Sequence, residues 1–421
     1  MKKQQAPAEK QDIVIVGGGM VGLSLALLLC REIPQLSVTV IESLPFPSDA
    51  VAPIVQPSFD ERSTALSANT VEVLQNLGIW SALLPAACEI EQVLVSDRGH
   101  LGGVTYAKEE NGQKELGYVV GNTGFGRVLF EQVQEIEQIN LIGEAVVESI
   151  MPVKGGSQIF YTDGQGGHVL FSRLAIIADG ADSRLRAGLG IQVTEKAYDQ
   201  HALIANVETD QAHNGRAYER FTEQGPLALL PLKSDSGVGK FALVWTRPSE
   251  LVDQFLDMSD DEFLQQLHCF FGYRQGRFLR VGQRVSYPLK LMMAQEQVRT
   301  GIVLMGNAAH FLHPVAGQGF NLALRDCVQL TAILGQSLRN GEEIGSLSVL
   351  QRYIAEQEQD QWLTTFISHS FNQLFSTDRF SSQVVRTSGL LSLELLPVAK
   401  QMFFKQMMGQ GFSRTNLQAF K

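Results

Sequence analysis

Three glycines near the start of the sequence have the spacing of a phosphate-binding turn. Gly17, Gly19 and Gly22 fit the pattern G-x-G-x-x-G. The first glycine allows a tight turn, the second lets the backbone approach a pyrophosphate, and the third lets a helix pack closely on a strand. Unpaired backbone N–H groups at the start of that helix would face the phosphates. The spacing therefore predicts a dinucleotide site, with a purely structural strand–helix turn as the alternative.

The segments on either side of these glycines must position them. A β-branched run at residues 13–16 precedes the glycines, an alanine- and leucine-rich segment follows them, and a second β-rich run at 38–41 ends on Glu42. This order predicts strand, turn, helix and strand. A carboxylate at the end of the second strand can accept hydrogen bonds from both hydroxyls of an adenosine ribose. These residues alone leave NAD and FAD open.

A second strand-like run, residues 174–178, ends at Asp179 and Gly180. Ser183 then has the type and position of a helix N-cap. Asp179 can face a ligand from the strand end, or it can act as an ordinary turn or capping aspartate. The spacing leaves both interpretations open.

A third strand-like run, residues 301–305, ends at Gly306 and Asn307. The following loop contains Gly317 and Gly319 and precedes a predicted helix over residues 321–338. Like the first motif, this segment places glycines before a helix start, where backbone N–H groups can point at an electron-rich ligand.

Two arginines lie close to predicted helix starts. Apolar side chains over residues 64–77 recur at near-helical spacing, so Arg62 would lie at the entrance of that helix. Its guanidinium can bind a cofactor phosphate or a flavin edge, or it can form an ordinary surface ion pair. Arg127 would lie near the first turn of a helix that follows Gly121.

Composition limits the class of protein. The 421 residues are enough for two domains or one large discontinuous domain. A net charge of −10 argues against binding to nucleic acid, whose phosphates would be repelled. Four scattered cysteines predict neither a metal site nor a disulfide framework and favour a reducing compartment. No apolar stretch reads as a membrane span, so we expect a cytoplasmic protein.

The strand and helix patterns divide the chain into three parts. Residues 191–288 contain short alternating runs and one predicted helix, which indicates a mostly antiparallel sheet inserted into a nucleotide-binding scaffold. The expected division is a discontinuous nucleotide-binding domain (11–80, 107–190 and 289–345), a second domain (81–106 and 191–288) and a C-terminal helical region (346–421). In that last region, residues 390–408 are rich in leucine, methionine and phenylalanine with lysines. They predict helix packing, a subunit contact or a lipid-facing surface.

Three motifs together resemble the class A flavin-dependent aromatic hydroxylases: GGGMVG at 17–22, ADGADSR at 178–184 and MGNAAHFLHPVAGQGFNLALRD at 305–326. The resemblance implies an α/β fold, with an FAD-binding Rossmann-like domain of the para-hydroxybenzoate hydroxylase type and an inserted β-sheet substrate domain. Stretches at 95–102, 219–232 and 306–322 are most similar to the ubiquinone-biosynthesis hydroxylases, in particular those that act on 2-polyprenyl-6-methoxyphenol.

The resemblance implies FAD as the bound dinucleotide. Carried onto this sequence, it places Gly17, Gly19 and Gly22 at the ADP of the cofactor and Glu42 at the adenosine ribose. It places Arg62 and Arg127 along the FAD, Asp179 behind it, and Gly306 with Asn307 at the ribityl chain and pyrophosphate. The residues that it places beside the isoalloxazine are Pro314, Gly317, Gly319 and Asn321. Asn307 departs from the family, most of whose members have aspartate there. Its side-chain oxygen can still accept a hydrogen bond from a ribityl hydroxyl.

The implied reaction uses NAD(P)H as a transient reductant and O2 to form a flavin hydroperoxide, which hydroxylates the ring of an electron-rich phenol. Such chemistry belongs to the cofactor, so no nucleophile, triad or metal is needed. We expect a dry apolar pocket over the flavin, with residues 287–289 helping to line it. No general base is identified, because His310 and His313 are each at least as well explained as structural hydrogen-bonding residues.

A polyprenylated phenol is a lipophilic substrate. It suits a protein that contacts the inner face of the membrane or receives substrate within a ubiquinone-biosynthesis complex. Three alternatives stay open at this point. They are a flavin hydroxylase of another ubiquinone intermediate or small aromatic acid, an NAD dehydrogenase, which leaves the third motif unexplained, and a structural subunit that retains FAD.

Overall fold

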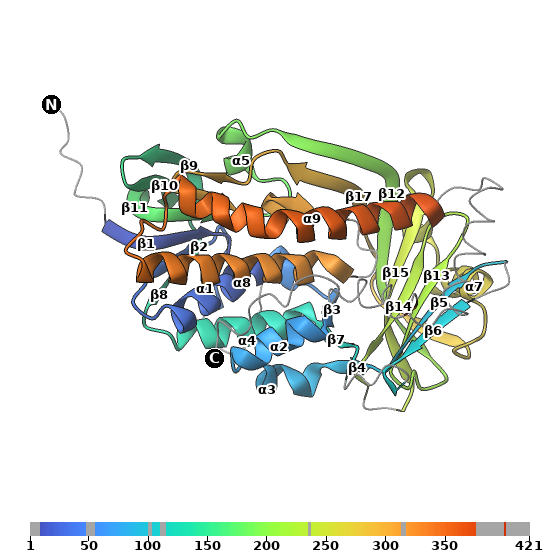
Figure 1. Cartoon of the computed structure of the whole chain (residues 1–421). Helices are drawn as coiled ribbons and strands as arrows, with labels where there is room; N and C mark the ends of the chain where they lie inside the picture. The colour runs from blue at the N-terminus through green and yellow to red at the C-terminus, as the bar shows by residue number, and fades with distance from the viewer. Residues whose placement is uncertain are drawn as a thin grey trace.

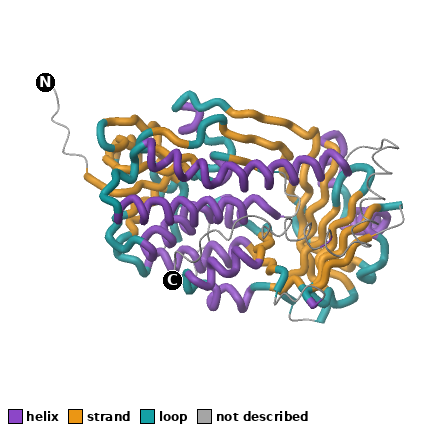
Figure 2. The backbone as a smooth tube through the Cα atoms, in the orientation of Figure 1, coloured by secondary structure: helices purple, strands orange, loops and turns teal. Residues whose placement is uncertain are grey.

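Two large sheets stand at opposite ends of the molecule, with a layer of long helices between and below them (Figures 1 and 2). The computed structural model describes residues 9–47, 55–99, 103–109, 115–234, 237–312, 317–375 and 400. Predicted positions Pro314 and His313, and the segment 390–408 apart from Lys400, lie outside the described residues.

The first sheet has eight strands, with β1 (Glu9–Val16) near its centre. β1 pairs in parallel with β2 (Val38–Ile41) on one side and with β11 (Gly166–Ile177) on the other. Residues 13–15 of β1 are fully buried, as expected for a parallel strand covered on both faces. The remaining strands are β8 (Ile139–Ile142), β9 (Val146–Val153), β10 (Gly156–Asp163), β18 (Val298–Arg299) and β19 (Ile302–Leu304).

Strand order brings the three motifs to one edge of this sheet. β19 runs parallel to β11, and β11 runs parallel to β1. The carboxyl ends of these strands therefore lie side by side, although they are far apart in the sequence. This is the edge at which doubly wound folds bind ligands.

Long helices cover the same sheet. α1 (Met20–Glu32) packs against α8 (Gln318–Arg339) and α4 (Asn122–Gln134), and α9 (Leu347–Phe375) lies beside α8 (Figure 1). Their buried leucines and the isoleucines Ile13 and Ile15 of β1 belong to one hydrophobic core. The start of α8 reaches toward the second sheet (Figure 1). A short helix, α5 (Arg184–Gly188), follows β11 and is capped by Ser183, as predicted.

The predicted helix over residues 64–77 is wrong in its first part. Residues 63–67 form β3 (Ser63–Ser67), and α2 (Ala68–Asn76) begins only after it. β3 pairs antiparallel with β7 (Gly117–Gly121), which also pairs with β4 (Cys88–Ile90). That pairing comes from a distant segment and is absent from the local pattern. Arg62 therefore precedes a strand, and α3 (Trp80–Leu83) follows α2.

The second sheet has nine strands in the order β20-β17-β12-β15-β14-β13-β5-β6, with β16 paired to β12. All pairs are antiparallel except β13 with β5. The strands are β5 (Gln92–Asp97), β6 (Gly103–Ala107), β12 (Val193–Thr209), β13 (Arg216–Phe221), β14 (Leu227–Leu232), β15 (Gly239–Pro248), β16 (Phe278–Val281), β17 (Val285–Ala294) and β20 (His310–Phe311).

Two helices, α6 (Val252–Asp257) and α7 (Asp260–Phe271), cover one face of this sheet; the prediction had one helix. Trp245 is fully buried on that face against Phe255 and Phe263. The opposite face of the sheet turns toward the first sheet and its helices.

The predicted α/β class with an inserted antiparallel sheet is confirmed. The domain limits stay a prediction; β17 crosses the limit placed at 288/289, and β20, from the returning scaffold, joins the second sheet. Within the described residues, no helix is both long enough and apolar enough to cross a membrane.

Candidate functional site

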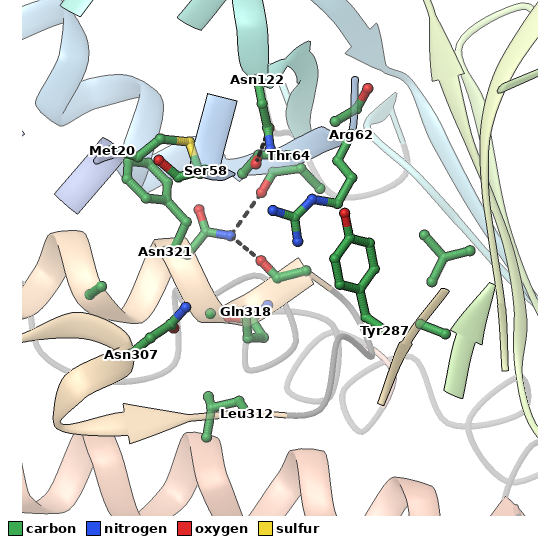
Figure 3. A pocket seen from close by; sticks show the side chains of 18 of the residues that line it. Met20, Ser58, Arg62, Thr64, Asn122, Tyr287, Asn307, Leu312, Gln318 and Asn321 are labelled. Atoms are coloured by element: carbon green, nitrogen blue, oxygen red, sulfur yellow. Dashed lines mark hydrogen bonds between the residues drawn. The ribbon is translucent and has the colours of Figure 1, made fainter. Parts of the chain in front are cut away.

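One cavity of about 670 Å³ runs from the glycine turn after β1 to the open face of the second sheet. Figure 3 shows part of it, where side chains from β3 and the segment before it, from β17 of the second sheet and from the start of α8 come together. Nine predicted cofactor positions line this cavity: Gly17, Gly19, Glu42, Arg62, Asp179, Asn307, Gly317, Gly319 and Asn321. The fold therefore brings together residues from the whole length of the sequence.

The three glycines of the first motif are required for different reasons. Gly17 has a φ of +113°, and a Cβ there would lie 2.4 Å from the Ala178 carbonyl oxygen. A Cβ on Gly22 would lie 1.9 Å from the carbonyl oxygen of Gly17 itself. A Cβ on Gly19 would meet only the Ser58 hydroxyl, at 2.8 Å. Gly17 and Gly22 thus shape the turn, and Gly19 keeps the cavity wall open.

Glu42 is held firmly at the end of β2. Its Oε2 accepts a 2.7 Å hydrogen bond from the Gly18 N–H, and its Oε1 accepts from the Ser43 hydroxyl and the Leu44 N–H. These bonds orient the carboxylate at the cavity wall beside the start of α1. The position suits the recognition of hydroxyl groups on a bound nucleotide.

In the part of the chain that the structure describes, two buried polar atoms of the cavity wall have no hydrogen-bond partner. They are the Ser58 hydroxyl and the Gln56 Oε1, both next to the glycine turn. Leaving buried polar atoms unpaired is costly, so they indicate that a polar ligand completes their hydrogen bonds. A sugar or phosphate of FAD would fit here. The sequence interpretation missed both residues, because the irregular loop that carries them has no recognisable pattern.

Asp179 and Asn307 lie at the ends of β11 and β19 and both line the cavity. Burial raises the pKa of Asp179, although its carboxylate accepts hydrogen bonds from Ser183 and Leu185, which lower it. Both interpretations of Asp179 therefore apply, since it faces the cavity and also braces the start of α5. Gly306 lies behind Asn307 with a φ of +60°, where a Cβ would crowd the neighbouring α1.

Arg62 stands where the two sheets approach each other. Its guanidinium pairs with Asp60, with an N–O distance of 2.7 Å, and lies over the ring of Tyr287, 4.6 Å from its centre (Figure 3). The Tyr287 hydroxyl donates to Asp60 Oδ2, the same oxygen that lies 2.7 Å from the Arg62 guanidinium. The ion pair anticipated as one alternative is present, and it faces the cavity. Arg127 lies in the second turn of α4 and is not among the lining residues, so its role stays a prediction.

The start of α8 forms another part of the cavity wall. Gly317 adopts a left-handed conformation as the N-cap, and Gly319 has open space around it. Two helix N-termini, those of α1 and α8, therefore border one cavity. Backbone N–H groups at both are suited to electron-rich parts of a ligand.

Asn321 is buried, and its side chain is fully used by the protein. Its amide donates to the Ala65 and Gly317 carbonyl oxygens, and its Oδ1 accepts from the Ser67 N–H and the Thr70 hydroxyl (Figure 3). Asn321 thus positions the start of α8 against β3. It lies in the cavity wall, where its polar side-chain atoms are all hydrogen-bonded within the protein, and its place beside a flavin stays a prediction.

His310 was one of two candidate bases. It is 1% exposed, and its Nε2 lies 2.6 Å from an oxygen of the equally buried Asp326 of α8. It does not line the cavity, which favours the structural interpretation. The other candidate, His313, lies outside the described residues. Among the described residues, no group of three or more metal-ligating side chains occurs.

The far end of the cavity is apolar. The open face of the second sheet supplies small and branched side chains, including Ala202, Ile204, Ala228, Leu230, Ala242 and Val244. Leu289 of β17 is 4% exposed and also lines the cavity, together with Tyr287 and Pro288. This placement agrees with the expected water-poor pocket. The cavity therefore joins the glycine turn after β1 to an apolar chamber.

Comparison with known proteins agrees with this arrangement. Residues 10–365 match the model of the FAD binding domain family. The chain is 32% identical over 398 residues to ubiquinone hydroxylase UbiL of Rhodospirillum rubrum, covering 94% of this chain and 89% of that one. It is 30% identical over 401 residues to 3-demethoxyubiquinol 3-hydroxylase of Escherichia coli, covering 94% and 98%. The fold resembles p-nitrophenol 4-monooxygenase PnpA of Pseudomonas putida DLL-E4, with a TM-score of 0.76 at 19% identity, covering 96% and 100%.

Proposed function

This chain belongs to the FAD binding domain family, and from that premise we propose that it hydroxylates the aromatic ring of a polyprenylated phenol in ubiquinone biosynthesis. NAD(P)H supplies two electrons, one atom of O2 enters the ring, and the other leaves as water. The observation that carries the proposal is the continuity of the cavity. The glycine turn and strand ends line one end, and the apolar face of the second sheet lines the other.

Relatives support the substrate class. By their names, the two relatives are a ubiquinone hydroxylase and a 3-demethoxyubiquinol 3-hydroxylase, and each is matched over most of its length. An apolar chamber next to a nucleotide site suits a ring that carries a lipophilic chain. We therefore propose the same class of reaction and of substrate for this chain. Experiment must identify the ring position that is hydroxylated.

FAD, when bound, transfers electrons from NAD(P)H to O2 and activates one oxygen atom for transfer to the ring. The chain's own residues bind, orient and exclude water. Gly17, Gly19 and Glu42 would hold the ADP end, with Ser58 and Gln56 completing its hydrogen bonds. N–H groups at the start of α8 would stabilise negative charge on the reduced flavin. Leu289 and the apolar sheet face would keep water from the reacting atoms.

We place the protein at the inner face of a membrane or beside partner proteins of a biosynthetic complex, because a polyprenylated phenol partitions into lipid. The sequence of residues 390–408, with its leucine, methionine, phenylalanine and lysine, supports this contact. It lies outside the described residues apart from Lys400.

The test is turnover by the purified protein with bound FAD. It would be given 2-polyprenylphenols of short chain length, NADH or NADPH, and ¹⁸O2, and the products would be identified by mass spectrometry. We expect a product with one ¹⁸O in the ring, and NAD(P)H oxidation that depends on the phenol. Oxidation that no prenylated phenol stimulates would contradict the proposal and favour a structural subunit that retains FAD.

A further inference from the structure

A carboxylate stands on the otherwise apolar face of the second sheet. Glu219 is the central residue of β13, and strand alternation places it on the same face as Ala217 and Phe221. Its partners on the adjacent strands are Val95 of β5 and Ala228 of β14. All five residues line the cavity. An acidic side chain therefore faces the chamber at a position where the neighbouring strands present apolar groups.

Glu219 differs from the other carboxylates of the cavity. Three carboxylate residues line it, and both Glu42 and Asp179 accept hydrogen bonds from protein donors. Burial alone raises the pKa of Glu219 to about 7, with no hydrogen bond or charged group in the described part of the chain contributing. Glu219 is partly buried and lines the cavity. A carboxylate among apolar neighbours with no protein donor in the described part of the chain is available to accept a hydrogen bond from a ligand.

Among the described residues of β5 and β6, two titratable side chains share this side of the sheet by strand alternation: Asp97 of β5, paired with Phe221, and Tyr106 of β6, paired with Val93. On the same side of the sheet, Tyr106 of β6 is fully buried, and burial raises its pKa. Toward the nucleotide end stand Tyr287 and the paired Arg62 and Asp60. None of these described groups contributes a charge effect to the pKa of Glu219.

We propose that Glu219 is the general base that receives the hydroxyl proton of the phenol substrate. This inference rests on the proposed function, and it names the group that activates the ring. The substrate O–H donates a hydrogen bond to the carboxylate and then breaks. The proton passes to Glu219, and the electron pair stays on the phenolate oxygen and delocalises into the ring. The ortho and para carbons become more nucleophilic toward the activated oxygen atom.

The proton balance closes without another reagent. After oxygen transfer, the ring carbon that received oxygen releases its proton to water, and the Glu219 carboxylic acid returns its proton to the phenolate oxygen. Glu219 ends ionised, as it began. A base that titrates near neutral pH combines a useful ionised fraction with sufficient proton affinity, which is the condition for efficient general base catalysis.

The first test compares Glu219→Gln with the wild-type holoenzyme during turnover of 2-geranylphenol. We expect kcat to fall on the order of 100- to 10,000-fold, the usual contribution of a general base. The decline in wild-type activity below about pH 7 should disappear. Glu219→Asp should recover part of the rate. FAD content and the rate of flavin reduction by NAD(P)H should stay at wild-type values, which separates this role from a structural one.

The matched control is Glu223→Gln. Glu223 is exposed in the turn after β13, four residues beyond Glu219. This variant removes the same charge from the same hairpin, so its rate and pH profile should equal those of the wild type. If Glu219→Gln also keeps the wild-type rate and the wild-type decline in activity below about pH 7, the inference is overturned.

The second test needs no turnover and no variant. Binding of 2-geranylphenol and of its methyl ether to the oxidised wild-type holoenzyme can be followed by the change in flavin absorbance between pH 5.5 and 8.5. The phenol donates a hydrogen bond to ionised Glu219, so its affinity should rise with pH. The ether buries the carboxylate without a donor, so its affinity should fall. Their affinity ratio should change on the order of 10- to 100-fold.

The same titration with Glu219→Gln should give flat curves for both ligands. Equal pH slopes for phenol and ether in the wild type would overturn the inference even if Glu219→Gln failed to fold. The two proposals also fail separately. A protein that hydroxylates no prenylated phenol but shows opposite binding slopes refutes the proposed function alone, whereas normal hydroxylation with equal slopes refutes the role of Glu219 alone.

Discussion

Asn321 and Ser67 are 254 residues apart in the sequence and are joined by a 2.9 Å hydrogen bond from the Ser67 N–H to the Asn321 Oδ1. The bond ties the end of β3 to the first turn of α8. It fixes the N-terminus of α8 at the cavity wall, where its N–H groups face the space that a flavin would occupy.

Replacing Asn321 with alanine should therefore destabilise the protein by about 2–4 kcal/mol. The change leaves the Ser67 N–H and the Thr70 hydroxyl without their buried acceptor. Denaturant unfolding would measure the loss, and FAD retention should fall with it. Asn340→Ala, at an exposed helix end, is the control and should change stability by less than about 0.5 kcal/mol. A similarly small loss of stability in both variants would contradict this structural role of the Asn321 side chain.

Gly22→Ala should abolish FAD retention and lower stability by about 3 kcal/mol, the upper end of overpacking costs. The new methyl group would lie 1.9 Å from the Gly17 carbonyl oxygen, a backbone atom that has no freedom to rotate away. Gly124→Ala provides the comparison. It lies in α4 with no atom within 4 Å of the added Cβ, so it should be neutral or slightly stabilising. Flavin absorbance after purification decides between these outcomes.

Leu289→Asp should increase H2O2 release per NAD(P)H consumed. Leu289 is 4% exposed in the cavity wall, and a carboxylate there would bring water to the reacting atoms. Leu279→Asp makes the same change on β16, where the leucine is 50% exposed, and should leave coupling at the wild-type value. Unchanged peroxide release from Leu289→Asp would count against its place in the water-excluding wall.

Cysteine reactivity offers a direct check of burial. Cys269 is exposed, whereas Cys30, Cys88 and Cys327 are buried, and burial raises the pKa of Cys30 to about 12. Thiolate is the reactive form, so iodoacetamide at pH 8 should modify Cys269 and spare the other three. Mass spectrometry should find one label on the native protein and four after denaturation. Native Cys269→Ser should take up none; rapid labelling of Cys30 would disagree with its place in the core.

Truncation after Leu396 should reduce association with liposomes without loss of FAD. The removed segment carries methionine, phenylalanine and lysine in a pattern that suits a lipid surface. Flotation of full-length and truncated protein with anionic vesicles would measure the difference. If the truncated protein still associates with the vesicles, another part of the chain must make the membrane contact.

Much of the nucleotide end was predictable from the sequence. The turn at Gly17 to Gly22 is a local unit, and the clash that forbids a side chain at Gly22 involves an atom only five residues away. The spacing of the glycines was therefore sufficient to predict this turn. Strand ends at Asp179 and Asn307 were likewise recognisable, and they line the predicted cavity.

Other features depend on partners that no local pattern contains. Residues 63–67 have helical apolar spacing but form a strand, because β7 pairs with them from 50 or more residues away. Asn321 was expected beside the flavin, yet its hydrogen bonds go to β3 and α2. His310 stood in a promising motif and is buried against Asp326 instead.

The sequence by itself determined the class of ligand, because a phosphate-binding turn is built from neighbours in the chain. Only the tertiary structure decided where the chemistry on the substrate can occur. Glu219 is one acidic residue in an alternating strand, and an inward charge on such a strand was the available signal. Its isolation arises because β5 and β14 place Val95 and Ala228 beside it, and burial among apolar groups is a property of the assembled sheet.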